Sequence, residues 1–155
     1  MISQILKDTD VAPDQLEIEI TETLLMHDVQ QAINTLQELQ ALGMTIAIDD
    51  FGIGYSSFNY LKTLPINVLK VDREFIKDIP DHLDDMEITA AIISMAHRLN
   101  LRVVAEGIET QVQQVFLEEH DCDFGQGYLF SRPVPLDQFM ALLPATEACA
   151  PELSD

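Results

Sequence analysis

The sequence has few basic residues, little cysteine and no tryptophan. It contains 8 Lys and Arg against 27 Asp and Glu, which gives a formal net charge of -19 at pH 7. Proteins that bind duplex DNA, RNA or anionic lipid do so with clustered Lys and Arg. The composition therefore argues against duplex nucleic acid and anionic membrane as partners. It leaves room for a small anionic ligand, provided that metal cations lie between the ligand and the acidic residues.

Cysteine pairs and targeting signals are also lacking. Cys122 and Cys149 form no CxxC pair, and we interpret both as free thiols of a cytoplasmic protein, because disulfides persist in oxidising compartments. No apolar run reaches the roughly 18 residues of a membrane-spanning helix, and the start MISQILKDTD does not have the basic and apolar regions of a signal peptide. Neither GxGxxG nor GxxxxGK[ST] occurs, so dinucleotide and P-loop folds have no support.

What is present is a regular alternation of strand-like and helix-like segments in 155 residues, of which 47% are hydrophobic. The expected strands are 16–21, 45–49, 67–72, 102–107 and 124–130. The expected helices are 2–7, 27–43, 84–100, 110–120 and 135–143, with a short helical turn within 56–64. This alternation is typical of an α/β fold with parallel strands. Both an open doubly wound sheet and a (β/α) barrel fit, and both place ligands at the carboxyl ends of the strands.

Two helices have a clear apolar stripe with a period of 3.6 residues. The first stripe consists of Val29, Ile33, Leu36 and Leu39, and the second of Ile88, Ala91, Ile92, Met95 and Leu99. Gly43 is the expected end of the first of these helices, and Thr110 is the expected N-cap of the helix over 110–120.

The strands carry polar residues on one face only. Side chains alternate between the two faces of a strand, so each expected strand has an apolar face and a face with a charged or amide group near its carboxyl end. These groups are Glu19, Asp49, Lys70, Asp72, Glu106 and Gln126. A parallel sheet covered by helices on both faces would show continuous apolar runs instead. A barrel accounts for the pattern, because its apolar face meets the outer helices while its polar face points inward.

Several carboxylates at one barrel mouth cannot all stay ionised without counter-charge. Hard divalent ions such as Mg²⁺ or Mn²⁺ prefer oxygen ligands of this kind. The adjacent pair Asp49 and Asp50 can serve two neighbouring metal ions, an arrangement that suits in-line displacement at phosphorus. Lys70 would neutralise a phosphate or hold the attacking hydroxide, and Gly52 and Gly54 would let the following loop approach a ligand or move.

Taken singly, each of these motifs has a structural interpretation. An Asp-Asp pair after a strand is usually a turn or a helix cap, and an inward Lys-x-Asp is usually an internal ion pair. The convergence over five strands is what favours a metal site.

Five strings carry a specific family resemblance. They are LEIEITE (16–22), IAIDDFGIGYSSFNYL (46–61), LKVDREFI (69–76), VVAEGIET (103–110) and FGQGYLFSRPVP (124–135). With these strings in this order and at this spacing, the sequence resembles the EAL-domain family of cyclic di-GMP phosphodiesterases from about residue 2 to residue 143. The resemblance implies a modified TIM-type (β/α) barrel that hydrolyses cyclic di-GMP to pGpG with Mg²⁺ or Mn²⁺.

The resemblance also implies roles for individual residues. Glu19 matches a ligand of the first metal, Asp49 a ligand shared by both metals, and Asp50 a ligand of the second. The loop that follows usually reads DDFGTGYSS in the family, and Ile53 replaces its threonine here.

Further matches concern catalysis and support. Lys70 and Glu106 match groups that position or activate the metal-bound water. Asp72 and Gln126 match residues that line the same site, and we group Gln126 with the catalytic residues. Glu22 and Glu109 match supporting positions.

By the same resemblance, the chain contains the C-terminal five or so βα units in residues 1–143, followed by a flexible acidic tail over 144–155. The Glu-Ala-Leu strand and an inward asparagine, each a source of a first-metal ligand, would lie upstream. We therefore expect the isolated chain to be inactive and to self-associate through open barrel edges. Two alternatives to a phosphodiesterase are a non-catalytic cyclic di-GMP-binding module and a half-barrel without independent function.

Overall fold

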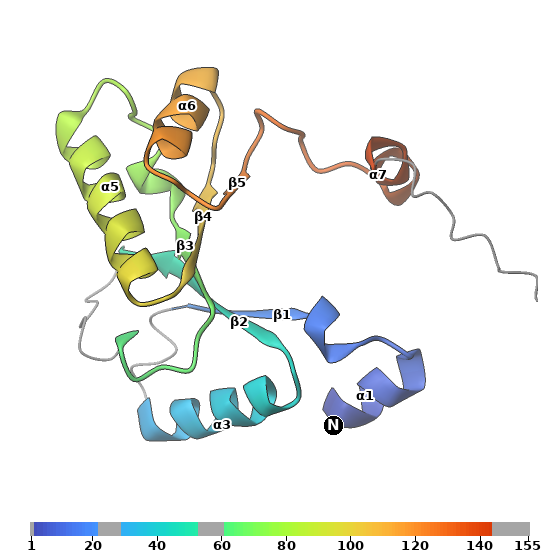
Figure 1. Cartoon of the computed structure of the whole chain (residues 1–155). Helices are drawn as coiled ribbons and strands as arrows, with labels where there is room; N and C mark the ends of the chain where they lie inside the picture. Colours follow the sequence, from blue (N-terminus) through green and yellow to red (C-terminus); the bar gives the residue numbers. More distant parts are fainter. Residues whose placement is uncertain (1, 22–28, 53–60, 144–155) are drawn as a thin grey trace, which may run out of the picture.

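The computed structural model describes residues 2–21, 29–52 and 61–143, and its centre is one parallel five-stranded sheet (Figure 1). The strands are β1 (Glu17–Thr21), β2 (Thr45–Phe51), β3 (Val68–Val71), β4 (Arg102–Glu106) and β5 (Phe124–Gln126). Each strand pairs with the next one along the chain, in the order β1-β2-β3-β4-β5. A doubly wound sheet reverses its strand order at a switch point. The described strands have no such reversal, so the winding is that of a (β/α) barrel.

Helices cover one face of this sheet. The helical elements are α1 (Ile2–Thr9), α3 (Val29–Ala41), α5 (Leu83–Arg98), α6 (Gln111–Glu119) and α7 (Leu136–Leu142), with two 3-10 turns, η1 (Pro13–Gln15) and η2 (Arg73–Phe75). Leu36 of α3, Ile93 of α5 and Phe116 of α6 pack into one core with the strands. Helix α7 stands apart from the sheet in Figure 1, and all seven of its residues are exposed. None of the helices described is long and apolar enough to cross a membrane.

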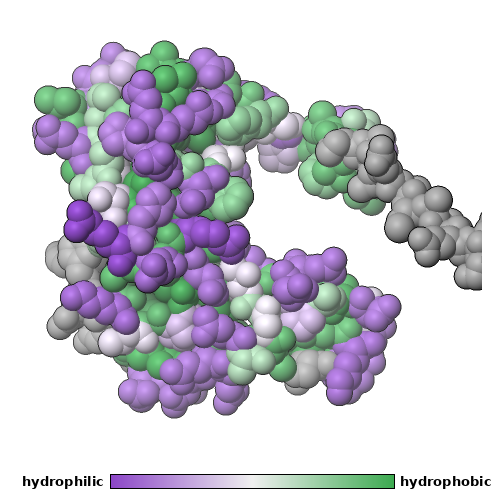
Figure 2. Space-filling view, viewed as in Figure 1, coloured by the Kyte–Doolittle hydropathy of each residue, from purple (hydrophilic) through white to green (hydrophobic). Residues whose placement is uncertain are grey.

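The two faces of the sheet differ as the alternation predicts. In β2, β3 and β4 the apolar face is buried under the helices, with at most 1% exposure at Ile46, Ile48, Leu69, Val71 and Val103. The opposite face carries the charged residues. In the space-filling view of Figure 2, the surface is hollowed between the part built by α5 and α6 and the part built by α1 and α3.

Most expected elements are confirmed, but the last strand is not. β5 ends at Gln126, whereas we expected a strand to residue 130. The chain turns at Gly127, because Phe130 N donates to Gly127 O and Leu129 N donates to Ile108 O. The aromatic residues of this segment favour a strand on propensity alone, and these turn hydrogen bonds override that preference.

The expected stripe of α5 is also wrong in part. Ile88 is 43% exposed and Ala91 is exposed, while the buried residues of the helix are Thr89, Ile92, Ile93 and Ala96. The buried face is centred on Thr89, a polar residue that a search for apolar periodicity passes over. The stripe of α3 is confirmed around the buried Leu36.

Two helix boundaries are confirmed by their backbone geometry. Gly43 follows α3 with φ of +99°, a left-handed value that favours glycine. Thr110 caps α6, since its side chain accepts a hydrogen bond from Gln113 N at 3.3 Å. Glu22, Ile53, residues 56–60 of the expected turn and the tail over 144–155 lie outside the described residues.

Candidate metal centre

Lys70 is the centre of the candidate site. Its Nζ lies 2.8 Å from Glu19 Oε1, 3.1 Å from Asp49 Oδ1 and 2.7 Å from Glu106 Oε1. The four residues come from β3, β1, β2 and β4. Parallel strands end at the same edge of the sheet, so side chains of one parity near those ends converge. The expected convergence of Glu19, Asp49, Lys70 and Glu106 is therefore observed.

The electrostatics of this cluster keep Lys70 charged. Its side chain is only 7% exposed, and burial by itself disfavours an ammonium group. Ion pairs with Glu106, Glu19 and Asp49 outweigh that burial and hold the pKa of Lys70 above its ordinary value. One ammonium faces three carboxylates, so the cluster has a net negative charge that a bound cation would neutralise.

A β-bulge allows the adjacent Asp49 and Asp50 to serve the same edge. Ile48 pairs with Leu69 and Phe51 pairs with Val71, so two residues of β2 oppose the single Lys70 of β3. Asp50 adopts a left-handed φ of +54° at this bulge. Regular alternation would turn Asp50 toward the helices, whereas the bulge leaves it exposed beside its neighbour.

The pKa of the Asp50 carboxyl group is shifted by its surroundings. Partial loss of hydration, followed by repulsion from Asp49 and Asp72, raises the pKa of Asp50, and Lys70 offsets only part of the effect. Repulsion between acids of this kind is relieved by a bound cation.

The donor atoms fit a hard divalent ion. Asp49 Oδ1 is buried and lies within ion-pair distance of Lys70, but among the described residues it is the one buried side-chain oxygen or nitrogen without a hydrogen bond. Glu19 and Glu106 have 48% and 21% of their side chains exposed, so their oxygens can be reached from solvent. An all-carboxylate set suits Mg²⁺ or Mn²⁺ better than metals that prefer thiolate or imidazole.

Among the described residues, the other predicted site residues, Asp72, Glu109 and Gln126, lie around this cluster rather than in it. Asp72 Oδ1 accepts a hydrogen bond of 2.7 Å from Glu74 N and so caps η2. Glu109 Oε1 pairs with Arg73 Nη2 at 2.8 Å. Gln126 is opposite Glu106 in the β4–β5 register, with an exposed side chain.

Sequence reasoning missed Arg73, Thr89 and Gln113, which contact the strand ends of the site or the turn between them. The one signal in the sequence that could have found Thr89 and Gln113 is a polar residue at a helix position that faces the core. Thr89 and Gln113 are 0% and 3% exposed.

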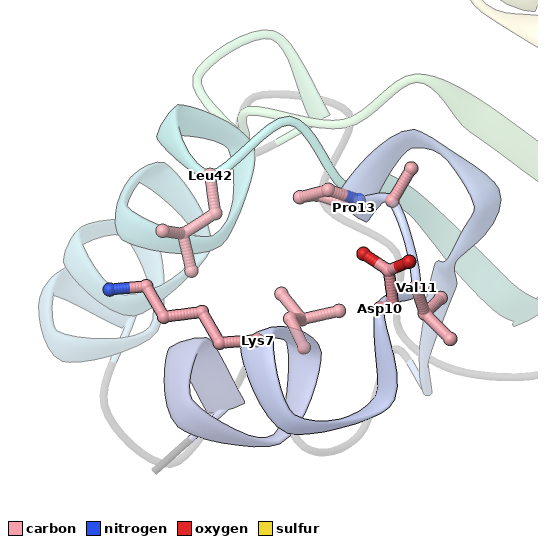
Figure 3. Close-up of a pocket in the computed structure, with 7 residues that line it drawn as sticks. Lys7, Asp10, Val11, Pro13 and Leu42 are labelled. Atoms are coloured by element: carbon pink, nitrogen blue, oxygen red, sulfur yellow. The ribbon is translucent and has the colours of Figure 1, made fainter.

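A cavity of about 370 Å³ lies elsewhere, between α1 and the segment after α3 (Figure 3). Its lining residues are Leu6, Lys7, Asp10, Val11, Ala12, Pro13 and Leu42. They precede β1 and β2, so this cavity is at the amino ends of the strands and has no part in the carboxylate cluster.

Comparison with known proteins identifies relatives of the chain. A model of the EAL domain family matches residues 1–133. The cyclic di-GMP phosphodiesterase NbdA of Pseudomonas aeruginosa is 57% identical over 121 residues, which are 78% of this chain and 16% of NbdA. The chain spans 16–20% of the length of the curated relatives it matches.

Comparison with solved structures also finds cyclic di-GMP complexes. The PaMucR phosphodiesterase in complex with c-di-GMP matches with a TM-score of 0.85 and 43% identity, over 89% of this chain and 56% of that one. The manganese and cyclic di-GMP complex of Klebsiella pneumoniae BlrP1 matches with a TM-score of 0.79 and 36% identity, over 85% of this chain and 34% of that one.

Proposed function

Because the chain belongs to the EAL domain family, we propose that it is part of a divalent-metal-dependent phosphodiesterase that hydrolyses cyclic di-GMP to pGpG. The observation that carries the proposal is the contact of Lys70 with Glu19, Asp49 and Glu106 from three other strands. The names of NbdA as a cyclic di-GMP phosphodiesterase and of PaMucR as a c-di-GMP complex support the substrate.

In this proposal, Glu19 and Asp49 hold one Mg²⁺ or Mn²⁺, and Asp49 and Asp50 hold a second. Bound metal of this kind supplies a Lewis acid and neutralises charge on the phosphate oxygens. The β-bulge is the feature of the chain that lets adjacent residues contribute to both positions. The BlrP1 complex with manganese supports the choice of metal.

Lys70 and Glu106 act on the reacting groups. Lys70 stays protonated among carboxylates, so it offers a fixed positive charge to a phosphate oxygen in a largely dehydrated place. Glu106, held 2.7 Å from Lys70 Nζ, positions the attacking water or accepts its proton. Gln126 adds an amide at the next strand, while Asp72, Glu109 and Glu22 support the strand ends.

In this proposal residues 1–143 are the C-terminal part of the barrel, and residues 144–155 lie outside the described residues. Further metal ligands come from outside this segment, so the isolated 155-residue chain is expected to produce no pGpG. Its edge strands, β1 and β5, are suited to pairing with a second copy. A cytoplasmic location accords with the unpaired thiol of Cys122.

The test uses the full-length protein, that is, this chain together with the segment that supplies the further metal ligands. It is incubated with cyclic di-GMP and Mn²⁺, and pGpG is measured by chromatography. Asp49→Asn is expected to lower turnover at least about 100-fold, because a metal ligand is lost. Asp14→Asn in η1, at the other end of the sheet, is the matched control and should keep full turnover. Binding of cyclic di-GMP without hydrolysis would favour the non-catalytic module, and absence of both binding and hydrolysis would overturn the proposal.

A further inference from the structure

The turn η2 lies between two glycines that follow the acidic strand ends. Gly52 has φ of +100° and comes two residues after Asp50, and Gly107 has φ of +73° and directly follows Glu106. A Cβ at Gly52 would lie 2.7 Å from Phe75 Cε2, and one at Gly107 would lie 2.3 Å from Arg73 Cγ. The side chains of one 3-10 turn therefore rest against both neighbouring strand ends.

The helices hold this turn from the other side. Thr89 Oγ1 of α5 donates to Phe75 O at 3.1 Å, and Gln113 Nε2 of α6 donates to Ile76 O at 3.1 Å. Thr89, Gln113 and Lys70 are the buried polar or charged residues among those described. A buried polar side chain is tolerated where it is hydrogen-bonded, and here two of the three are bonded to η2 or to the residue after it.

The segment Gly107–Glu109 is fastened to the same turn. Arg73 Nη2 pairs with Glu109 Oε1 at 2.8 Å. Glu109 N donates to Gln113 Oε1 at 2.8 Å, so one side-chain amide connects the residues after η2 with the residues after β4.

We propose that η2 sets the spacing of the Asp49–Asp50 pair and Glu106 around Lys70, and that Arg73 and Phe75 are its positioning residues. The measurement of kcat that tests this positioning role rests on the proposed function. The cap of η2 is Asp72, two residues after Lys70, so the turn, the central cation and both flanking strand ends form one connected unit. A displacement of about 1 Å in such a site lowers turnover by as much as about 100-fold.

The Arg73–Glu109 pair allows positioning to be separated from folding. The two side chains are 57% and 42% exposed, and ion pairs this exposed contribute little to stability. A variant that loses the pair should therefore keep its melting temperature, so any loss of activity would report on geometry.

The experiment uses the full-length protein with Mn²⁺ and compares three variants. Arg73→Ala removes both the aliphatic part of the side chain that lies against Gly107 and the ion pair with Glu109. Arg73→Met keeps an aliphatic side chain at this place and removes only the ion pair. Lys77→Met is the control, because it removes an exposed ion pair with Glu74 and leaves both strand-end glycines covered. We expect kcat to fall about 10- to 100-fold in Arg73→Ala with KM within about threefold, a smaller fall in Arg73→Met, and no change in Lys77→Met.

Hydrogen exchange gives a second readout that does not depend on activity. The amides of Ile108 and Glu109 should exchange faster in Arg73→Ala and at the wild-type rate in Lys77→Met. Unchanged kcat and unchanged exchange in Arg73→Ala, or a rise in KM alone, would overturn the positioning role. A wild-type protein that neither binds Mn²⁺ nor forms pGpG would overturn the proposed function, while the exchange comparison would still decide whether Arg73 positions the strand ends. If Arg73→Ala fails to fold, the kcat and the hydrogen exchange of Arg73→Met, compared with those of Lys77→Met, test the positioning role by the same outcomes.

Discussion

Lys70 Nζ lies 2.7 Å from Glu106 Oε1 across the β3–β4 pair, and the same nitrogen reaches carboxylates of β1 and β2. A buried ammonium thus supplies counter-charge at the point where four strand ends meet. The sheet is held together at its polar face by this cation and at its apolar face by the core.

Replacing Lys70 should destabilise the fold. Lys70→Met removes the ammonium and leaves Glu19, Asp49 and Glu106 close together without a basic partner. We expect the free energy of unfolding to fall by about 3 kcal/mol, because removal of one partner leaves the other charges uncompensated. Urea denaturation of the full-length protein at pH 7 measures this, with Lys7→Met on α1 as the exposed control. Equal stability of the two variants would contradict the prediction.

Asp123 should make stability depend on pH. Its Oδ2 accepts hydrogen bonds from Val103 N at 2.7 Å and from His97 Nε2 at 3.0 Å. Burial alone would raise the pKa of Asp123, but the bond from Val103 and the interactions with His97 outweigh it and lower the pKa below its ordinary value. A carboxylate with a lowered folded pKa contributes stability above its ordinary pKa, and this contribution is lost as the pH falls through the folded value.

Asp123→Asn should therefore be less stable than the wild type at pH 7, and the difference should shrink as the pH falls below about 4. Denaturation curves at a series of pH values measure the difference. Asp121→Asn is the matched control, because Asp121 is exposed and its φ of +59° is one that asparagine tolerates. A difference that stays constant down to pH 3 would argue against a titrating Asp123.

Gly127 should tolerate no side chain. A Cβ there would lie 2.1 Å from Ile108 O and 2.3 Å from Ile108 N, which are backbone atoms. Gly127→Ala should lower the free energy of unfolding by about 3 kcal/mol, since the backbone segments that follow β4 and β5 must move apart. Gly43→Ala separates conformational strain from this clash, because its nearest neighbour would be Pro13 Cβ at 3.5 Å. Its positive φ should cost about 1 to 2 kcal/mol, and a larger effect at Gly43 than at Gly127 would contradict the argument.

The buried face of α5 can be checked by a pair of isoleucines. Ile93 is 1% exposed and Ile88 is 43% exposed. Ile93→Ala should lower the free energy of unfolding by about 3 kcal/mol through lost burial and a cavity, whereas Ile88→Ala should change it by less than about 1 kcal/mol. Thermal or urea unfolding of both variants measures the contrast, and equal losses would restore the apolar stripe that the sequence predicts.

Much of the candidate site was predictable because strand geometry is local. Side chains alternate along any strand, so Glu19, Lys70 and Glu106 share a face whatever the rest of the fold does. The parallel winding brings their strand ends together, and the structure confirms that prediction. Asp50 follows a different rule: it has the wrong parity and stays beside Asp49 only because β2 bulges opposite Lys70.

The sequence by itself determined the alternation of strands and helices, the polar and apolar faces of the sheet, and the acids that meet at its edge. Those features depend on residues close together in the chain and on the repeat of the backbone. Only the tertiary structure decided that Thr89 faces the core, that Gln113 connects α6 to the residues after η2, and that Arg73 lies over Gly107. Each of these arises from a contact between residues far apart in sequence, where a buried hydrogen bond or a missing Cβ outweighs local preference.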